Sequence, residues 1–189
     1  MTVIAGFVDK KSGKVYVGAD KGFFDDDNHC ISPEPKIMKK TIGKYEGKPI
    51  QMIIGNSGDI KPGNIITHWY TPKLKYDPTK QTPHEFMIKV FAPALKEQFD
   101  KNDYKKAGDC ECFVAFEGSI FIVNSDYSIM IPPDFGTGVG SAALPAIASL
   151  FTMNHLKIKL SPRKKIMLAI ETAIGISNTA KGPVDILVV

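Results

Sequence analysis

MTVIAGFVDKKSGKVYVGAD, residues 1–20 of this chain, contains two short runs rich in β-branched residues, at 3–8 and 15–19. A turn at 10–13 that ends in glycine separates these runs. Two such runs around a glycine-containing turn predict a β-hairpin. We therefore expect the N-terminus to be fixed inside a sheet rather than left as a loose tail.

The rest of the chain is a succession of strand-like and helix-like patterns. Apolar residues in 84–99 recur at helical spacing, and Pro93 is expected to kink or interrupt that helix. Ser161 followed by Pro162 is typical of a helix start. The other expected elements are a polar loop at 21–35, strands at 36–42 and 50–55, a short helix at 60–69, strands at 112–116, 119–124 and 128–131, a glycine-rich turn at 136–140, a buried helix at 142–153 and a last strand at 184–189.

The order of these elements predicts the fold class. Four strands, two helices, three strands, two helices and one strand follow one another, and most strands are joined by hairpins. This order argues against alternating β-α-β units and a parallel sheet. We expect an α+β fold of two antiparallel sheets packed face to face with a helical layer outside each, a four-layer αββα sandwich. A single domain spanning residues 1–189 is expected.

Composition and charge exclude several functions. The formal net charge is +4 and the lysines are scattered, whereas a nucleic-acid surface needs a clustered basic stripe. No stretch approaches the roughly 20 apolar residues that span a bilayer. No basic segment precedes the first apolar run, so a secretory signal is not expected. The sequence therefore predicts a cytoplasmic protein that binds neither nucleic acid nor membrane.

The three cysteines, Cys30, Cys110 and Cys112, do not make an even set for disulfides. Free thiols in a reducing compartment are the simpler interpretation. Cys110 and Cys112 would share one face of a strand, but no second pair of Cys or His residues accompanies them. We expect no metal and no cofactor.

Several local motifs, in their order and spacing, resemble those of proteasome β subunits and HslV-type peptidases, the N-terminal-nucleophile (Ntn) hydrolases. MTVIAGFV is followed by VYVGAD, which ends at Asp20, and PKIMKK places Lys36 sixteen positions later. MIIGNSGD is a strand running into a turn of small residues, and GTGVGSAALPAIASL is a glycine-rich turn running into a buried helix. The resemblance covers nearly the whole chain.

The resemblance implies a role for each matching residue. After removal of Met1, Thr2 would be the nucleophile and its own amine the general base. Lys36 would lower the pKa of the amine and the hydroxyl as a nearby cation, and Asp20 would hold Lys36 in place. A backbone N–H of the turn at 55–59, with Gly58 as first choice, would stabilise the oxyanion.

Two further positions depart from the family's pattern. Thr137 replaces the usual serine of the glycine-rich turn. The family has an acidic residue and a hydroxyl residue after its fourth helix, and here that stretch reads AIGISNTAKG, residues 173–182. Ser177 or Asn178 could be the partner of the amine. Glu171 lies one to two helical turns too early to supply the acid.

By this resemblance the protein is a threonine endopeptidase that degrades unfolded polypeptides. It would form a homo-oligomeric ring and receive its substrate from an AAA+ unfoldase of the HslU type. Two alternatives remain open at this point. One is a non-catalytic ring subunit with a proteasome-like fold, and the other is an Ntn amidase that acts on a small amide.

Overall fold

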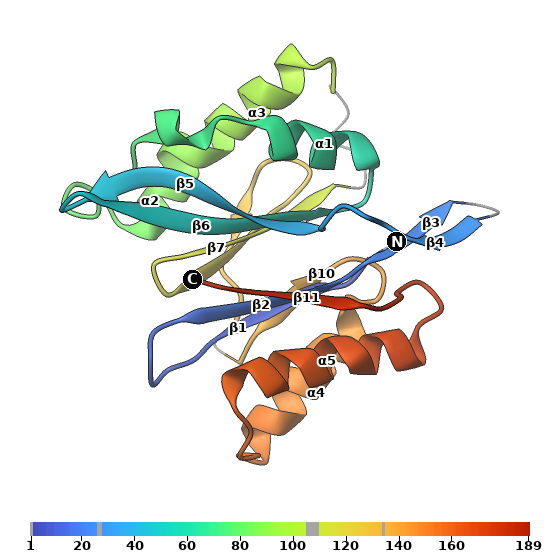
Figure 1. The fold of residues 1–189 in the computed structure, drawn as a ribbon. Coiled ribbons are helices and arrows are strands. Elements are labelled where there is room, and N and C mark those ends of the chain that lie inside the picture. Colours follow the sequence, from blue (N-terminus) through green and yellow to red (C-terminus); the bar gives the residue numbers. More distant parts are fainter. Residues whose placement is uncertain (1, 26–27, 105–109, 134) are drawn as a thin grey trace.

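The computed structural model describes residues 2–25, 28–104, 110–133 and 135–189. Figure 1 shows two β-sheets face to face, with helices on the outer face of each. The predicted α+β fold, a four-layer αββα sandwich, is confirmed. The helices on one side are α1 (Ile60–His68), α2 (Pro83–Phe86) and α3 (Ala92–Lys101), and those on the other are α4 (Ala143–His155) and α5 (Pro162–Ile176).

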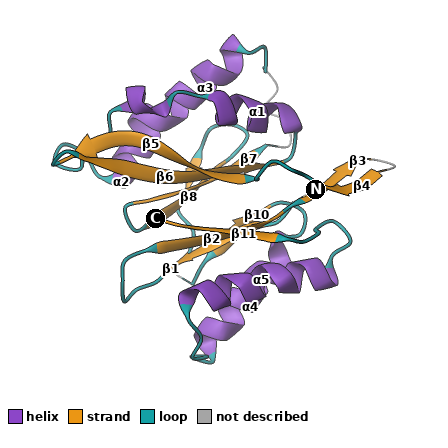
Figure 2. Ribbon diagram, in the orientation of Figure 1, coloured by secondary structure: helices purple, strands orange, loops and turns teal. Residues whose placement is uncertain are grey.

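Both sheets are antiparallel, as expected from the hairpin links (Figure 2). The larger sheet has the order β5-β6-β7-β8-β9 and the smaller one β10-β1-β2-β11. Because β1 lies between β10 and β2, the chain that follows Thr2 is held from both sides. The strands are β1 (Ile4–Val8), β2 (Val15–Asp20), β5 (Ile37–Tyr45), β6 (Lys48–Ser57), β7 (Glu111–Phe116), β8 (Ser119–Val123), β9 (Ile129–Met130), β10 (Thr137–Val139) and β11 (Val184–Val188).

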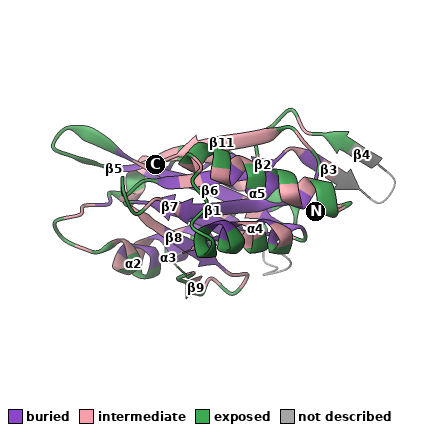
Figure 3. Cartoon of the chain, turned by 90° about the horizontal axis from the view of Figure 1, so that it is seen from below, coloured by how far each residue is buried: buried purple, intermediate pink, exposed green. Residues whose placement is uncertain are grey.

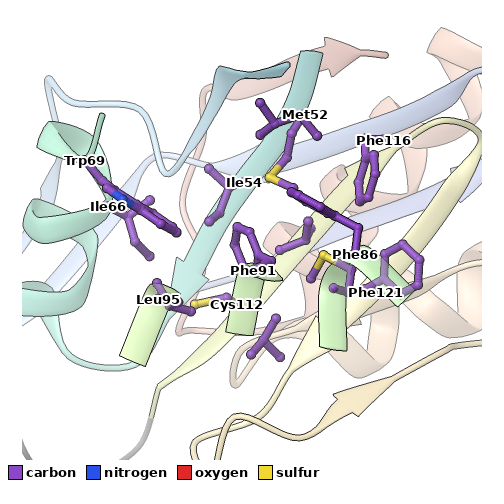
Figure 4. Packing of buried hydrophobic residues seen from close by; sticks show 14 of the residues in the cluster. Met52, Ile54, Ile66, Trp69, Phe86, Phe91, Leu95, Cys112, Phe116 and Phe121 are labelled. Carbon is purple, nitrogen blue, oxygen red and sulfur yellow. The ribbon is translucent and has the colours of Figure 1, made fainter. Parts of the chain in front are cut away.

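The hydrophobic core has three parts, which the layers separate. Aromatic side chains dominate the part under α1 to α3, where Phe86, Phe116 and Phe121 meet (Figure 4). Alanines such as Ala146 and Ala173 dominate the part under α4 and α5, and aliphatic residues fill the space between the sheets. Figure 3 shows the buried residues concentrated in the strands and exposed ones on the outer surfaces of α4 and α5. Burial on both faces explains why the strands read as nearly continuous apolar runs.

Several local predictions are confirmed. The two residues of the turn between β7 and β8, Glu117 and Gly118, have φ angles of 48° and 66°, the positive values that a tight hairpin turn requires. Ser161 caps α5, where its side chain accepts a hydrogen bond from the backbone N–H of Lys164. No helix within the described ranges is both long and apolar enough to cross a membrane.

Pro93 interrupts its helix in the way its chemistry demands. A wide π turn, Met87–Phe91, stands between α2 and α3, and Pro93 lies in the first turn of α3. The backbone N–H of Ala92 bonds to the carbonyl of Met87, five residues back. Since proline has no N–H and its ring clashes with the carbonyl four residues earlier, the wider turn makes room for it.

The prediction of a long loop at 21–35 was wrong. Two short strands, β3 (Gly22–Asp25) and β4 (Asn28–Ile31), pair there as a separate two-stranded ribbon beside the start of β1 (Figure 1). The ribbon belongs to neither large sheet. Its sequence, GFFDDDNHCI at 22–31, lacks the regular alternation of apolar and polar residues by which strands are recognised in a sequence.

The prediction of a glycine-rich turn at 136–140 was also incomplete, because residues 137–139 form strand β10 beside β1. A Cβ atom at Gly138 would lie 2.8 Å from the carbonyl oxygen of Ile4, and one at Gly136 would lie 2.8 Å from that of Gly6. These glycines therefore allow two backbones to approach closely within a sheet.

Candidate active site

A cavity of about 150 Å³ opens where the start of β1 meets the turn between β6 and α1. Its lining brings together three of the predicted site residues, Thr2, Lys36 and Gly58. They come from the segment before β1, the segment before β5 and the turn after β6. The fold thus gathers residues far apart in the sequence at one edge of the sandwich.

The backbone around Thr2 is firmly held. Thr2 is buried, with 6% of its surface exposed, and its carbonyl accepts a hydrogen bond from the N–H of Ala142 at 3.2 Å. The next residue, Val3, donates its N–H to Oδ1 of Asp20 at 2.9 Å and accepts from the N–H of Asp20 at 3.2 Å. Met1, whose removal the mechanism requires, lies outside the described residues.

Asp20 is fully buried and is the centre of the hydrogen bonding beside the cavity. Its Oδ1 accepts from the ammonium of Lys36 at 2.8 Å as well as from Val3. Its Oδ2 accepts from the N–H groups of Gly22, at 2.9 Å, and Lys181, at 3.1 Å. Four donors compensate the removal of this carboxylate from water. Asp20 therefore ties β1, Lys36 and the segment before β11 into one unit.

Lys36 extends into a largely enclosed place, with 13% of its side chain exposed. Burial lowers the pKa of its ammonium, and the carboxylate of Asp20 offsets part of that effect. The ammonium and the carboxylate form an ion pair in which each compensates the burial of the other. This arrangement fits the role expected of Asp20, which is to hold the ammonium of Lys36 at the cavity that Thr2 also lines.

Gly58 occupies the turn directly before α1, with a φ angle of +102°. Asp59 follows as the N-cap residue of that helix. The N–H groups at a helix start carry partial positive charge and have no partner within the helix. The turn is therefore electrostatically suited to receive a developing negative charge at the cavity.

Gly140 is a site residue to which the sequence analysis gave no role. It has a φ angle of +101°, and a Cβ atom there would overlap the carbonyl oxygen of Thr2 and lie 2.9 Å from Oγ of Ser57. Glycine is thus required both by the backbone conformation and by the space beside Thr2. Gly140 is the last residue of the motif GTGVG, which the sequence analysis interpreted only as a glycine-rich turn.

Thr137 is not brought to the cavity. It lies in β10 opposite Gly6, four positions along β1 from Thr2, or about 13 Å at roughly 3.3 Å per residue. Because β10 runs antiparallel to β1, later residues reach the start of β1, and Ala142 is the one that bonds to Thr2. The expectation treated the segment as a turn, in which all its residues would lie close together.

Ser177 lies at the end of α5, outside the cavity lining, and its Oγ is 2.7 Å from Oγ1 of Thr179. The hydroxyl of Ser141 donates to the same Thr179 oxygen at 3.0 Å. In this row of three hydroxyls, Ser141 precedes Ala142, whose N–H bonds to the carbonyl of Thr2. Ser177 is therefore linked to the backbone of Thr2 only indirectly, through Thr179 and Ser141. Asn178 and Glu171 are exposed.

The side chains that the structure describes contain no group of three or more His, Cys, Asp or Glu that could hold a metal ion. Cys30, Cys110 and Cys112 are free thiols, and the latter two are buried.

Solved structures were found that share this architecture over its whole length. BPH from Thiobacillus denitrificans in complex with epoxomicin matches with a TM-score of 0.76 at 14% identity, covering 100% of this chain and 98% of that one. The fold is proteasome-like. HslV from Trypanosoma brucei has a TM-score of 0.69 at 16% identity, covering 99% of this chain and 98% of that one.

Anbu from Yersinia bercovieri shares the proteasome-like fold as well, with a TM-score of 0.65 at 9% identity, covering 100% of this chain and 81% of that one. No family model matches the sequence, and a search of curated proteins found no match. The comparison therefore confirms the predicted fold, and the chemistry has to be argued from the residues of this chain.

Proposed function

We propose that this protein is a threonine endopeptidase in which Thr2, once Met1 has been removed, is the N-terminal nucleophile. One observation carries the proposal. Thr2 and Lys36 line the same cavity, and the ammonium of Lys36 is held at 2.8 Å by the fully buried carboxylate of Asp20. A buried ion pair contributes little net stability, so a role in catalysis accounts better for its position at the cavity that Thr2 lines.

The reaction follows from the chemistry of these groups. The liberated amine of Thr2, with a reference pKa of about 7.7–8.0, takes the proton of the hydroxyl while Oγ attacks the substrate carbonyl. The cation at Lys36 favours the unprotonated amine and the developing alkoxide. The N–H of Gly58 stabilises the oxyanion, and such a donor typically contributes about 10²–10³ in rate.

The tetrahedral intermediate then collapses. The bond to the leaving nitrogen breaks, the ammonium of Thr2 returns its proton to that nitrogen, and an ester on Oγ remains. Water, deprotonated by the same amine, attacks this ester and restores the hydroxyl. Each proton is returned, so the cycle needs no cofactor.

The solved structures support the proposal through their shared fold, and BPH has been solved with epoxomicin bound. We extend the proposal to the assembly. Copies of this chain form a closed ring that encloses the cavities, and an AAA+ unfoldase delivers unfolded polypeptide to it in the cytoplasm. Enclosure would restrict cleavage to unfolded chains that can be threaded inside.

One observation favours the alternative of a non-catalytic ring subunit. Neither Thr137 nor Ser177 lines the cavity, and Glu171, the nearest preceding acid on α5, is exposed. These three residues are then not the groups that orient the amine of Thr2, contrary to what the resemblance implies. Such a protein would assemble into rings without cleaving anything.

Degradation of an unfolded protein tests the proposal. Purified protein with a mature N-terminal threonine is incubated with a chemically unfolded, fluorescently labelled protein, and peptide release is followed. We expect release by the wild type, none by Thr2→Ala, and partial activity in Thr2→Ser, which keeps a hydroxyl. Equal release by Thr2→Ala would refute the assignment of the nucleophile, and rings without release would favour the structural alternative.

A further inference from the structure

Two buried thiols, those of Cys110 and Cys112, take no part in the proposed mechanism. Both belong to the core under α1 to α3, with 5% and 2% of their surfaces exposed. Glu111, the residue between them, is exposed and begins β7, so the two cysteines lie on the opposite, inner face of the chain. Cys112 lies there beside Leu95 (Figure 4). The fold thus places two free thiols side by side inside the core.

A small second cavity is lined by both cysteines. Its wall also includes Asn124, Ser125 and Tyr127, half-buried residues of the connection between β8 and β9. Its volume is about 10 Å³, which is about the smallest space that admits one molecule of the size of water. A small oxidant such as hydrogen peroxide can therefore approach the thiols, whereas a bulky thiol such as glutathione is excluded.

The two thiols differ in their acidity. The thiol of Cys112 donates a hydrogen bond to Cys110, which lowers the pKa of Cys110. The same hydrogen bond, together with burial, raises the pKa of Cys112. Cys110 is therefore the thiol that ionises first and attacks an oxidant, and Cys112 is placed to react with the product.

We propose that Cys110 and Cys112 are the site of a reversible oxidation that switches off the peptidase, an inference that rests on the proposed function. The sulfur of Cys110 attacks one oxygen of hydrogen peroxide, the O–O bond breaks, and a sulfenic acid and one water form. The sulfur of Cys112 then attacks the sulfenic sulfur, and the displaced hydroxyl leaves as water with the proton of Cys112. Two thiols and one peroxide give one disulfide and two waters, and a dithiol reductant restores the thiols.

This disulfide does not fit a fully extended chain. At roughly 3.3 Å per residue, residues two apart on a strand have Cα atoms about 6.6 Å apart. Disulfides most often join Cα atoms that are about 5.5–6 Å apart. The chain from 110 to 112 must therefore shorten when the bond forms.

The shortening acts on the end of β6. Cys112 is paired on both sides, with Asn56 of β6 and Val123 of β8, and is held in place. Glu111 forms the last pair between β6 and β7, with Ser57, and lies beyond the pairing of β7 with β8. Oxidation is therefore expected to pull Glu111 away from Ser57, the residue directly before Gly58.

A second contact joins the thiols to the same turn. Tyr104 lines the small cavity with the cysteines, and its hydroxyl donates to Oδ2 of Asp59 at 2.9 Å. Burial raises the pKa of Tyr104, so the phenol keeps its proton and remains a donor. Asp59 directly follows Gly58. Because residues on both sides of Gly58 are tied to the surroundings of the thiols, the disulfide would displace the N–H that stabilises the oxyanion.

Hydrogen peroxide applied to the protein with a mature N-terminal threonine tests the inference. Mass spectrometry should show the loss of two hydrogen atoms per chain and a peptide in which Cys110 and Cys112 are linked. Labelling of Thr2 by a peptide epoxyketone should then be at least about tenfold slower, and dithiothreitol should restore it. Amide hydrogen exchange in the segment 55–60 should become faster, which reports on the turn independently of activity.

Matched variants distinguish this pair from other oxidisable groups. In Cys110→Ala peroxide should leave the labelling rate unchanged, because no disulfide can form. Cys112→Ala should also keep its labelling rate, since a sulfenic acid on Cys110 alone does not shorten the chain. Cys30→Ala removes the exposed cysteine and should respond to peroxide as the wild type does.

The outcomes separate this inference from the proposed function. Thiols that stay free after peroxide treatment, or equal inhibition of Cys110→Ala, overturn the assignment of the oxidation to this pair. A disulfide that forms without slowing the labelling of Thr2 overturns the link to the active site. Absence of labelling in the reduced protein overturns the proposed function, and with it the regulation of a peptidase, even if the disulfide forms.

Discussion

The two sides of Thr2 are built in different ways. On one side Asp20 is fully buried and accepts four hydrogen bonds, three from backbone N–H groups and one from Lys36. On the other side the hydroxyls of Ser141, Thr179 and Ser177 bond to one another at a partly exposed surface. The buried hydrogen bonds of Asp20 hold both the ammonium of Lys36 and the backbone around Val3 in place. Water can replace each hydrogen bond between the partly exposed hydroxyls. We therefore expect both stability and activity to depend far more on the Asp20 side.

The largest effect is expected from Asp20→Asn. The amide keeps one acceptor oxygen but turns a donor toward N–H groups or toward the ammonium of Lys36, which leaves a buried cation without its counter-charge. The free energy of unfolding should fall by about 3–5 kcal/mol. Urea unfolding measures this loss, and labelling of Thr2 should fall below detection. A variant as stable as the wild type would contradict the role given to Asp20.

A large effect on activity is also expected from Gly140→Ala. The new Cβ atom would overlap the carbonyl oxygen of Thr2 and force a φ of +101° on a residue with a side chain, a strain of about 1–3 kcal/mol. The labelling rate should fall at least about tenfold, since small displacements of reacting groups are costly.

Gly13→Ala is the matched control for Gly140→Ala. Gly13 also has a positive φ, of 69°, but a Cβ atom there meets nothing within 4 Å. The control should therefore lose some stability and keep the labelling rate. Equal loss of labelling in both variants would mean that backbone strain, and not the contact with Thr2, is responsible.

A moderate effect is expected on the pH dependence of activity. Activity should rise as the amine of Thr2 loses its proton and fall as Lys36 loses its own. Because burial lowers the pKa of Lys36, the alkaline fall should lie below the pKa of an exposed lysine. The profile of kcat/KM measures both limbs. Lys36→Arg should move the alkaline limb upward, and an unchanged limb would show that Lys36 does not control it.

The same pKa shift has a consequence for stability. A lysine whose pKa is lower in the folded than in the unfolded state disfavours folding while it is protonated in both. Its destabilising contribution is complete below the folded pKa. It is relieved as pH rises from the folded pKa toward the unfolded one.

The smallest effect is expected from Ser177→Ala. The hydroxyl accepts the N–H of Thr179 at 3.1 Å, and its loss should cost about 0.5–1.5 kcal/mol in unfolding free energy. Labelling of Thr2 should change less than about threefold. A loss of activity comparable to that of Asp20→Asn would place Ser177 in the catalytic machinery, as the resemblance suggests.

The sequence predicted the sandwich because local signals agreed with one another. Apolar runs, the Glu117–Gly118 turn and the cap at Ser161 each specify an element by themselves. Thr2, Lys36 and Gly58 could be predicted to lie close together because each lies next to the end of a strand or helix, and the topology determines where these ends meet.

Other features depend on contacts that no local pattern encodes. The β3–β4 ribbon lies outside both sheets. Strand β10 is hard to recognise in the sequence because it is rich in glycine, which the close contact between backbones requires. The position of Thr137 follows from the register of β10 on β1, and a shift of a few positions separates it from Thr2.

The most direct measurement is mass spectrometry of the protein before and after treatment with a peptide epoxyketone. The account predicts an untreated mass without Met1 and, after treatment, one inhibitor bound per chain, mapped to Thr2 and missing in Thr2→Ala. A retained Met1, or an inhibitor that binds elsewhere or not at all, would contradict the claim that Thr2 is an N-terminal nucleophile.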